Sequence, residues 1–499
     1  MCGIFFCAQN NDSASTPSHE TLECLQRLRD ANAARGPDAQ QSHAITLPDS
    51  NKESVDRSSS PGISLEFFAS ELRLRGDSPV IQPHEKDGDI LCWNGEVFGG
   101  MDIAPQENDG VKVFEALRGT RDPEDVCNFF ASIEGPYAFV FYSKATQKLY
   151  FGRDPLGRRS LLIHRPTSRQ TWFLLASVSA GIDAAYSFEE VSTSQIQMID
   201  LQMLGSRDLS AYEECMTPLP RQSSILQLPY AEPANVNLTL PPENHPIPPL
   251  KPLSTIPEWL EPQVDQLISR LDLSIYARVR DIPRVDSLKA ARVAVLFSGG
   301  IDCTILTLLA DRHIPRDEPI DLLNVAFENP RKTKLKAEGN VAASPKREKK
   351  KRTTPQTDTQ VEASSYMVPD RVTGLQEVEE LRRLCPGRTW NFIEINVPYE
   401  ESKAARPIVE ALMLPSRTVM DLSLAQALYF ASRGTGFVRA SPEAEPVAYT
   451  STARVLLNGL GSDELLGGYS RHRMAFTHVG GWEAVIKEVE PLRIFSALA

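Results

Sequence analysis

The proline-rich stretch between residues 217 and 262 restricts the fold of this chain more than any other feature. It holds twelve prolines and almost no periodic apolar pattern, so neither a helix nor an inner strand is expected to run through it. A chain of 499 residues is also too long for one ordinary hydrophobic core. We therefore expect an extended, partly disordered linker at 206–262, between one domain at 1–205 and a second at 263–499.

The residues before the linker predict an α+β domain built on antiparallel sheets. Short β-rich runs, broken by Gly, Pro, Asn and Asp, recur from residue 1 to about 200. Apolar residues at helical spacing over about 20–34 and 110–131 predict helices that cover these sheets. The β-rich runs are ISLEFFASELRLR, DILCWNGEVFG, PYAFVFYSKATQKLYFGRD, SLLIH and WFLLASV.

The residues after the linker predict an α/β domain with a doubly wound parallel sheet. A helix at about 263–282 precedes VAVLF, a short apolar strand that runs into glycines and then into an apolar helix. DLLNVAFE and TWNFIEINV follow as buried strands with helices between them. A stretch rich in Lys, Arg, Thr, Ser and Pro at 328–366 predicts a disordered insertion, and its basic run 346–352 is either a solvated loop or a nuclear-import or nucleic-acid patch.

Composition favours small-molecule chemistry in a reducing compartment. The formal net charge of -12 and the pI near 5.3 argue against nucleic acid or an anionic membrane as the main partner. No apolar run approaches the roughly 18 to 20 residues that a membrane span needs, and the first residues turn polar too early for a secretory signal, so we expect a cytoplasmic protein. Eight scattered cysteines predict free thiols, with neither disulfides nor zinc.

Cys2 is the candidate nucleophile. Removal of Met1 would leave a thiol and an α-amino group on one residue, and an α-amino pKa of roughly 7.7 to 8.0 suits a base near neutral pH. The alternative is a buried small side chain at the start of a strand, where many cysteines are found. MCGI alone does not decide between the two.

Further motifs bear on that choice. RGPD at 35–38, NGE at 94–96, ND at 108–109 and GRDPLGRRSLL at 152–162 resemble, in order and spacing, the class II glutamine amidotransferases. The resemblance covers residues 1 to 200 and implies antiparallel sheets sandwiched with helices, of the Ntn-hydrolase type. It also implies that Cys2 attacks glutamine while the Asn94 side chain and the Gly95 N–H form the oxyanion hole.

The same resemblance implies which residues bind glutamine. Asp109 aligns with the carboxylate that holds the substrate's α-amino group, and Asn94 and Glu96 complete the site. The arginine that clamps the α-carboxylate lies in ASELRLRG, where Arg75 is our choice and Arg73 the alternative. Asp154 and Arg158 are expected to shape a loop under the site.

SGGIDC at 298–303 lies between the strand VAVLF and the next helix. Glycine backbone and a helix N-terminus suit an anion such as pyrophosphate, and the pattern resembles the SGGxDS loop of ATP pyrophosphatases. A second cluster, NGLGSDELLGGYSRHR at 458–473, follows the apolar run ARVLL, and its Asp463 is expected to join Asp302 in holding Mg²⁺. The two motifs look like the synthetase domain of asparagine synthetase B. The residues expected at ATP are Leu296, Ser298, Gly299, Gly300, Asp302, Cys303, Val325, Gly459, Gly461, Ser462 and Asp463.

A narrower resemblance covers most of residues 284 to 475. LFSGGIDC, ADRHIP, DEPIDLLNVAF, PDRVTG, WNFIEINV, FASRG and GYSRHR look like the asparagine synthetase domain-containing proteins. The resemblance to asparagine synthetase B, combined with that of the N-terminal half, implies that ammonia released at Cys2 attacks an adenylated aspartate at the second site, with ATP and Mg²⁺ as cofactors. Glutamine, ATP and aspartate are thus the expected partners, and homodimerisation is left open.

Three departures from the asparagine synthetase pattern leave open whether the second domain forms asparagine. Leu460 stands where asparagine synthetases carry a glutamate near the aspartate, and Cys303 replaces the last Ser of SGGxDS. Synthetase domains of this kind also continue beyond the point where this chain ends, so either the gene model is truncated or the product lacks a complete second site. Three hypotheses follow: an asparagine-forming amidotransferase, a glutaminase with a degenerate synthetase domain used for nucleotide binding or regulation, and a non-catalytic scaffold.

Overall fold

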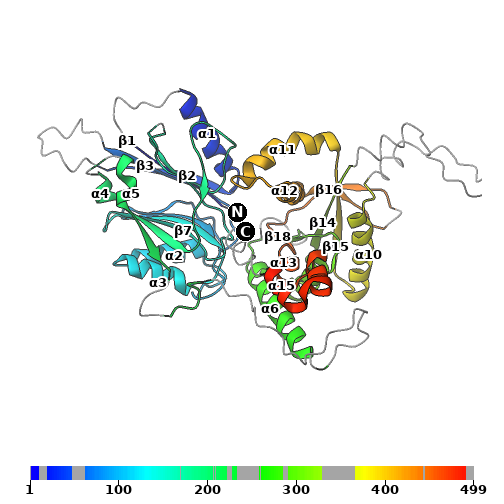
Figure 1. Ribbon diagram of the computed structural model, residues 1–499. Coiled ribbons are helices and arrows are strands. Elements are labelled where there is room, and N and C mark those ends of the chain that lie inside the picture. The colour runs from blue at the N-terminus through cyan, green and yellow to red at the C-terminus, as the bar shows by residue number, and fades with distance from the viewer. Residues whose placement is uncertain are drawn as a thin grey trace, which may run out of the picture. The chain divides into compact units, whose positions relative to one another are not determined.

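A computed structural model of the chain, drawn in Figure 1, describes residues 2–10, 19–47, 62–168, 170–205, 207, 209–221, 227–232, 258, 260–284, 290–328, 366–441 and 444–489. The chain forms two compact units. The first comprises 1–245, 410–417 and 463–499, and the second comprises 246–409 and 418–462. The units differ from the expected domains because the late segments 410–417 and 463–499 belong to the first unit. The order of residues in the sequence could not predict this.

Two six-stranded antiparallel sheets form the first unit. One has the strand order β10-β8-β9-β1-β3-β2 and the other β12-β11-β7-β6-β5-β4. The strands of the first sheet are β1 (Gly3–Asn10), β2 (Ala39–Leu47), β3 (Ile63–Glu71), β8 (Leu162–His164), β9 (Phe173–Ala176) and β10 (Glu189–Glu190). Those of the second are β4 (His84–Lys86), β5 (Asp89–Gly95), β6 (Tyr137–Ser143), β7 (Lys148–Arg153), β11 (Gln195–Asp200) and β12 (Met216–Pro220).

The two sheets pack face to face, with helices on their outer faces. Alternate residues of β1 show how this happens: Ile4 and Phe6 belong to the core between the sheets, whereas Phe5 and Cys7 pack under α1 (His19–Ala33). On the other side, α2 (Asp109–Arg118) and α3 (Pro123–Ser132) cover the second sheet (Figure 1). The predicted α+β sandwich of antiparallel sheets and helices is confirmed.

The predicted helical segment at 110–131 consists of two helices. The first ends at Gly119, and Asp122 caps the second by accepting a hydrogen bond from the Asp125 N–H at 2.9 Å. Pro123 occupies the first turn of α3, where its missing N–H costs nothing. The helical spacing of apolar residues continues across the interruption between the two helices, so the spacing alone does not reveal it.

The first unit extends beyond residue 205, where the sequence analysis ended the first domain. α4 (Leu201–Gly205), a 3₁₀ turn (Leu209–Ala211) and α5 (Tyr212–Cys215) lead into β12, which pairs antiparallel with β11. β12 carries two prolines and lies at the edge of its sheet, where a residue without an N–H is tolerated. Prolines that suggested a linker therefore belong in part to an edge strand.

The second unit contains one mixed sheet with the order β17-β16-β15-β14-β13-β18. The strands β15, β14, β13 and β18 are mutually parallel, as expected, and β16 and β17 add an antiparallel edge. These strands are β13 (Val293–Leu296), β14 (Ile320–Phe327), β15 (Trp390–Val397), β16 (Thr435–Val438), β17 (Val447–Thr450) and β18 (Val455–Leu457).

Helices cover both faces of this sheet, which confirms the predicted doubly wound arrangement. Val293 and Val295 face a core with α6 (Glu261–Val279), α7 (Ile301–His313) and α10 (Pro369–Leu384). Ala294 faces the opposite core with α11 (Tyr399–Met413) and α12 (Val419–Ser432). The remaining elements are α13 (Ser462–Leu466), α14 (Ser470–Met474), a π-helical segment (Ala475–Gly480) and α15 (Gly481–Val489).

Several expectations fall outside the described residues. These are most of the predicted linker and nearly all of the insertion at 328–366 with its basic run at 346–352. All eight cysteines are free, and seven of them are buried. No helix of the described residues is long and apolar enough to cross a membrane.

The buried Asn32 side chain joins α1 to the segment that follows β9. Its Nδ2 donates to the Leu28 carbonyl oxygen at 2.8 Å and to that of Val178 at 3.1 Å. Its Oδ1 accepts from the N–H groups of Ser177 and Val178 at 3.0 and 3.2 Å. Asn32 thus satisfies backbone groups of α1 and of the segment after β9, close to the start of β1.

Asn32→Ala should lower the free energy of unfolding by about 3 kcal/mol, because it leaves buried backbone donors and acceptors without partners. Denaturant unfolding would measure this loss. Gln26→Ala is the matched control: Gln26 lies on the same helix, but its side chain is exposed and, within the described residues, bonds only to the side chains of Arg29 and Asp30 on the same helix. Equal stability of the two variants would contradict the bridging role of Asn32.

Candidate functional site

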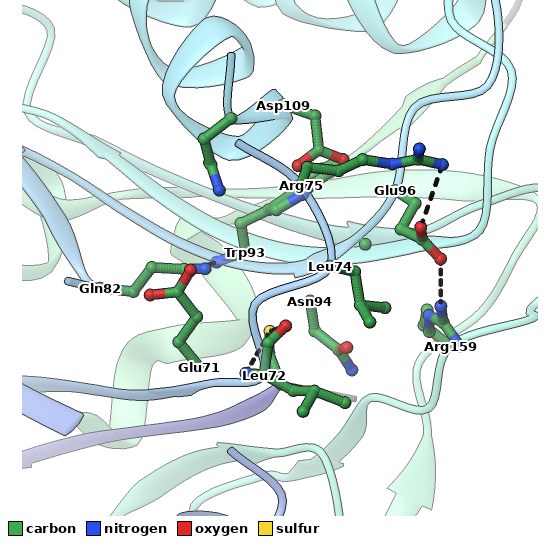
Figure 2. Close-up of a pocket in the computed structure, with 13 residues that line it drawn as sticks. Glu71, Leu72, Leu74, Arg75, Gln82, Trp93, Asn94, Glu96, Asp109 and Arg159 are labelled. Atoms are coloured by element: carbon green, nitrogen blue, oxygen red, sulfur yellow. Dashed lines mark hydrogen bonds and ion pairs between the residues drawn. The ribbon is translucent and has the colours of Figure 1, made fainter. Parts of the chain in front are cut away.

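Figure 2 shows a pocket in the first unit where segments distant in sequence meet. All six residues expected at the glutamine site, Cys2, Arg75, Asn94, Gly95, Glu96 and Asp109, line it. The other lining residues are Glu71, Leu72, Leu74, Gln82, Trp93, Asn108 and Arg159. Strands β3 and β5, the loop after β3 and the start of α2 supply most of this wall.

The RGPD motif fixes the chain around Cys2. Arg35 Nε donates to the Cys2 carbonyl oxygen at 3.0 Å, and the Asp38 N–H donates to the Glu71 carbonyl oxygen at 2.9 Å. A Cβ at Gly36 would lie 2.3 Å from the Glu71 nitrogen, so only glycine allows this approach. The motif therefore holds the start of β1 against the end of β3.

The Cys2 thiol is buried and bonded to the backbone. Its Sγ accepts a hydrogen bond from the Leu72 N–H at 3.4 Å. Burial raises the pKa of the Cys2 thiol above its ordinary value, and the negative charge of Glu71 adds to this, while the Leu72 bond and Arg159 act in the opposite direction. A thiol in this environment is protonated at neutral pH and needs a base to become a nucleophile.

Asn94 presents a hydrogen-bond donor with no acceptor. Its side chain is 1% exposed, and within the described residues its Nδ2 has no hydrogen-bond partner. Buried polar groups normally have partners, so an unpaired amide N–H in a pocket marks a position for a ligand oxygen. Next to it, a Cβ at Gly95 would lie 2.7 Å from atoms of Trp93 and Tyr137, which requires glycine there.

Charged side chains line the pocket near α2. Arg75 Nη2 lies 3.3 Å from one carboxylate oxygen of Glu96, and Arg159 Nη2 lies 3.4 Å from the other (Figure 2). Asp109 accepts from the Val97 and Gly110 N–H groups, both at 3.0 Å. Burial, with the nearby negative charge of Glu96, raises the pKa of Asp109 from 3.8 to about 6, although Arg75 opposes this.

The structure distinguishes the two arginines that the sequence left open. β3 ends at Glu71, so the strand alternation that would place Arg73 and Arg75 on one face does not continue through them. Arg75 is 7% exposed and lines the pocket. The Arg73 guanidinium instead lies at the surface and donates to the Asp77 carbonyl oxygen.

Sequence reasoning missed three pocket residues with unpaired polar atoms. Within the described residues, Glu71 Oε2, Trp93 Nε1 and Arg159 Nε are buried without hydrogen-bond partners. Glu71 and Arg159 lie inside the recognised segments ASELRLRG and GRDPLGRRSLL, and Trp93 directly precedes NGE. That position was the only available signal, because a side chain's direction near a strand end depends on the loop.

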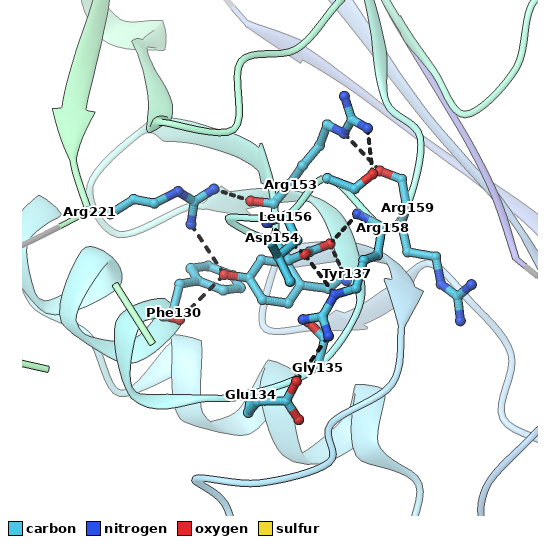
Figure 3. Close-up of polar contacts among 11 residues, drawn as sticks. Phe130, Glu134, Gly135, Tyr137, Arg153, Asp154, Leu156, Arg158, Arg159 and Arg221 are labelled. Carbon is cyan, nitrogen blue, oxygen red and sulfur yellow. Dashed lines mark hydrogen bonds and ion pairs between the residues drawn. The ribbon is translucent and has the colours of Figure 1, made fainter. Parts of the chain in front are cut away.

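Polar contacts hold the segment GRDPLGRRS together (Figure 3), and its Arg159 lines the pocket. Asp154 accepts from the N–H groups of Tyr137, Leu156 and Arg158 and from Arg158 Nε, at 2.9 to 3.2 Å. Arg158 also donates to Glu134 and to the Gly135 carbonyl oxygen. Asp154 and Arg158 thus shape the loop, as the sequence analysis expected, while the adjacent Arg159 faces the pocket.

The predicted pyrophosphate loop lies at the carboxyl end of β13 in the second unit. Gly299 has φ +81°, and a Cβ there would lie 2.4 Å from the Gly374 nitrogen, so glycine is required. The helix α7 that follows has no side-chain cap on its first turn. Cys303 is buried, and its Sγ donates to the Gly300 carbonyl oxygen at 3.1 Å, so the cysteine keeps the loop closed.

The second motif reaches the same edge of the sheet. β18 pairs in parallel with β13, and a Cβ at Gly459 would lie 2.8 Å from the Asp302 Cβ. Ser462 Oγ donates to the Gly459 carbonyl oxygen at 2.8 Å, whereas Leu460 is 48% exposed. The structure thereby brings the two glycine motifs together.

The remaining expected ATP residues are distributed between the units. Leu296 and Val325 are partly buried at the core with α12 on the neighbouring strands β13 and β14, and Gly461 has open space where a Cβ would lie. Asp302 belongs to the second unit and Asp463 to the first, so their pairing at Mg²⁺ stays a prediction. No group of three or more His, Cys, Asp or Glu side chains within the described ranges is arranged to hold a metal ion.

Comparison with curated proteins shows the family. The chain is 33% identical to human asparagine synthetase domain-containing protein 1 over 98% of this chain and 81% of that protein. It is 34% identical to the bovine protein of the same name over 89% of this chain and 77% of that protein. A Saccharomyces cerevisiae protein, asparagine synthetase domain-containing protein YML096W, is 27% identical over 94% of this chain and 78% of its own length. The chain belongs to the asparagine synthetase domain-containing protein family.

Two other comparisons add little. No protein-family model matches the chain. Among solved structures, a glutamine phosphoribosylpyrophosphate amidotransferase from B. subtilis, complexed with ADP and GMP, is 14% identical with a TM-score of 0.28 over 66% of each chain. A match with so low a TM-score supports no conclusion about this chain.

The raised pKa of Asp109 predicts a pH-dependent effect of Asp109→Asn on stability. Because the folded protein holds this proton more tightly than the unfolded chain, the stability that Asp109 contributes is complete below its unfolded pKa of 3.8 and is lost as the pH rises through about 6. The stability of Asp109→Asn relative to the wild type should therefore increase over this range, by at most about 3 kcal/mol.

Denaturant unfolding at several pH values would measure the difference between the two proteins. Asp125→Asn is the control, since Asp125 on α3 is only partly buried and its carboxylate accepts an exposed hydrogen bond from the Arg121 N–H. A difference between Asp109→Asn and wild type that stays constant with pH would contradict the raised pKa.

Proposed function

We propose that the first unit hydrolyses glutamine with Cys2 as the nucleophile, and that the whole protein is an ATP-dependent amidotransferase of the asparagine synthetase type. The observation that carries the proposal is the pocket itself. It is lined by a buried thiol, by an amide donor that has no partner among the described residues, and by cationic and anionic side chains. These groups match the carboxamide, α-carboxylate and α-ammonium of glutamine.

The proposed reaction begins with removal of Met1. The α-amino group of Cys2 then takes the thiol proton, and Sγ attacks the side-chain carbonyl carbon of glutamine. Asn94 Nδ2 and the Gly95 N–H stabilise the developing oxyanion. The carbon–nitrogen bond breaks, ammonia leaves, and water hydrolyses the thioester to glutamate and restores the thiol.

The charged side chains of the pocket are proposed to bind the α-carboxylate and the α-ammonium group of glutamine. Arg75 offers its guanidinium to the α-carboxylate, and Glu96 and Asp109 offer carboxylates to the α-ammonium. The ion pairs of Glu96 with Arg75 and Arg159 hold these side chains in position before substrate binds. When an ammonium group approaches, the pKa of Asp109 falls and its carboxyl ionises fully, because a nearby cation stabilises the charged form.

For the second unit, we propose that the loop from Ser298 to Cys303 binds the phosphates of ATP. Support comes from the uncapped N-terminus of α7 and from the close packing of Gly299 and Gly459, which leaves backbone rather than side chains at the sheet edge. Asp302 and Asp463 are the carboxylates proposed for Mg²⁺. Bound ATP would supply the adenylyl group that activates aspartate, so that the overall products are asparagine, glutamate, AMP and pyrophosphate.

Leu460 favours a second candidate function, a glutaminase whose synthetase domain serves nucleotide binding or regulation. An apolar side chain cannot move a proton or hold ammonium. Leu460 is 48% exposed and follows Gly459, and this exposure supports a position on the acceptor side of the proposed nucleotide site.

Cys2→Ala should abolish glutamate release from glutamine, because it removes the atom that forms the thioester. Asn94→Ala should reduce kcat about 100- to 1,000-fold by removing one oxyanion donor. Glutamate formation by purified protein whose Met1 has been removed, as checked by mass spectrometry, is the measurement.

Cys7→Ala is the matched control and should keep its activity, since Cys7 lies on β1, the strand that directly follows Cys2, but packs under α1, outside the pocket. Wild-type glutaminase activity in Cys2→Ala would refute the nucleophile. No activity in the mature wild-type protein would favour the non-catalytic scaffold.

The two candidate functions differ in pyrophosphate release. An asparagine-forming enzyme should release pyrophosphate from ATP only when aspartate is present, with asparagine formed in equal amount. Gly299→Val should abolish this signal without affecting glutamine hydrolysis, because a side chain at positive φ and 2.4 Å from backbone displaces the loop. Glutaminase activity without any aspartate-dependent pyrophosphate would favour the second candidate.

A further inference from the structure

Glu71 is a buried carboxyl that the roles assigned above do not use. It is the last residue of β3, is 2% exposed and lines the pocket with Cys2. Its backbone is fixed, because the Glu71 carbonyl oxygen accepts from the Asp38 N–H and the next residue donates its N–H to Cys2 Sγ. The side chain therefore starts one residue from the backbone group that holds the thiol.

Glu71 differs from the other two carboxyls that line the pocket, because one of its oxygens has no hydrogen-bond partner among the described residues. Both oxygens of Glu96 face guanidinium groups, and both oxygens of Asp109 accept backbone N–H bonds. Glu71 Oε2 is buried and accepts no hydrogen bond from any described residue. A buried carboxyl oxygen without a partner is costly, so its partner is expected to be a ligand.

The surroundings of Glu71 keep its carboxyl protonated part of the time near neutral pH. Its pKa is raised from 4.5 to about 7, mainly by burial. The negative charges of Asp38 and Asp109 also raise the pKa, and the positive charge of Arg73 lowers it. The Cys2 thiol also faces it, and an ionised Glu71 disfavours the thiolate. A protonated Glu71 removes this opposition and can donate a proton.

We propose that Glu71 is a further catalytic residue, which contacts the nitrogen of the scissile carboxamide and gives it the proton with which ammonia leaves. The assignment rests on the proposed glutaminase function. A carboxamide presents one oxygen and one NH₂ group. Among the described residues that line the pocket, Asn94 Nδ2 is one of the buried donors without a partner that could meet the oxygen, and Glu71 Oε2 is the buried carboxyl oxygen without a partner that could meet the NH₂ group.

The protons balance over one turnover. In acylation the Cys2 α-amino group takes the thiol proton, the sulfur–carbon bond forms, the carbon–nitrogen bond breaks, and the Glu71 proton leaves with nitrogen as ammonia. In deacylation Glu71 carboxylate takes a proton from the attacking water. The carbon–sulfur bond then breaks, and the thiolate recovers its proton from the α-ammonium group. Both groups return to their initial states, and no further reactant is needed.

Glu71→Gln tests this role, because it keeps the shape of the side chain but cannot give a proton. With glutamine as substrate, kcat/KM of the wild type should fall as the pH rises through about 7, since the acid form is needed. In Glu71→Gln this fall should disappear, and kcat/KM at the optimum should be about 100-fold lower. The hydroxamate analogue, glutamate γ-hydroxamate, should lose much less activity, because hydroxylamine is a weaker base than ammonia and leaves with less help.

Two further variants make the outcome decisive. Glu71→Asp keeps the carboxyl and should retain the alkaline fall with a smaller loss of activity. Glu66→Gln changes a carboxyl on the same strand that binds Arg29 outside the pocket, and should behave as wild type. Equal losses in Glu71→Gln and Glu71→Asp, equal losses for glutamine and the hydroxamate, or a wild-type pH profile in Glu71→Gln would overturn the assignment. Failure of wild type and Glu66→Gln to hydrolyse glutamine would instead refute the glutaminase function.

Discussion

The first unit depends on how tightly the beginning of β1 is enclosed. A Cβ at Gly3 would lie 1.9 Å from the Asn32 carbonyl oxygen, and the Gly3 N–H donates to Ser70 Oγ, which itself donates to that carbonyl. Arg35 holds the Cys2 carbonyl oxygen on the other side. These contacts fix the strand that begins at the pocket, so the thiol's position follows from backbone packing rather than from its own side-chain bonds.

The fold was largely predictable, because its signals are local. Period-two runs marked the strands of the sandwich, and continuous apolar runs marked the parallel strands of the second unit. The errors fell where context overrides local pattern. The prolines of β12 are acceptable only because β11 is its one partner strand, and the break before Pro123 interrupts an apolar period that continues on both sides.

The candidate site was predictable where a residue stands inside a motif and not where its direction depends on a loop. Asn94, Gly95, Glu96 and Asp109 reach the pocket directly from β5 and from the start of α2. Arg75 and Arg73 could not be separated by sequence, since the chain leaves the sheet between Glu71 and both of them. Arg159 was overlooked for the same reason: Asp154 turns Arg158 away, and the turn sends its neighbour inward.

The closure of β1 by Ser177 has a consequence for the order of events during synthesis. The Ile4 N–H donates to Ser177 Oγ, and the Ser177 N–H donates to the Ile4 carbonyl oxygen, across 173 residues of sequence. These bonds join the first strand of the unit to a segment that is synthesised 173 residues later, so β1 cannot reach its final position until Ser177 has left the ribosome.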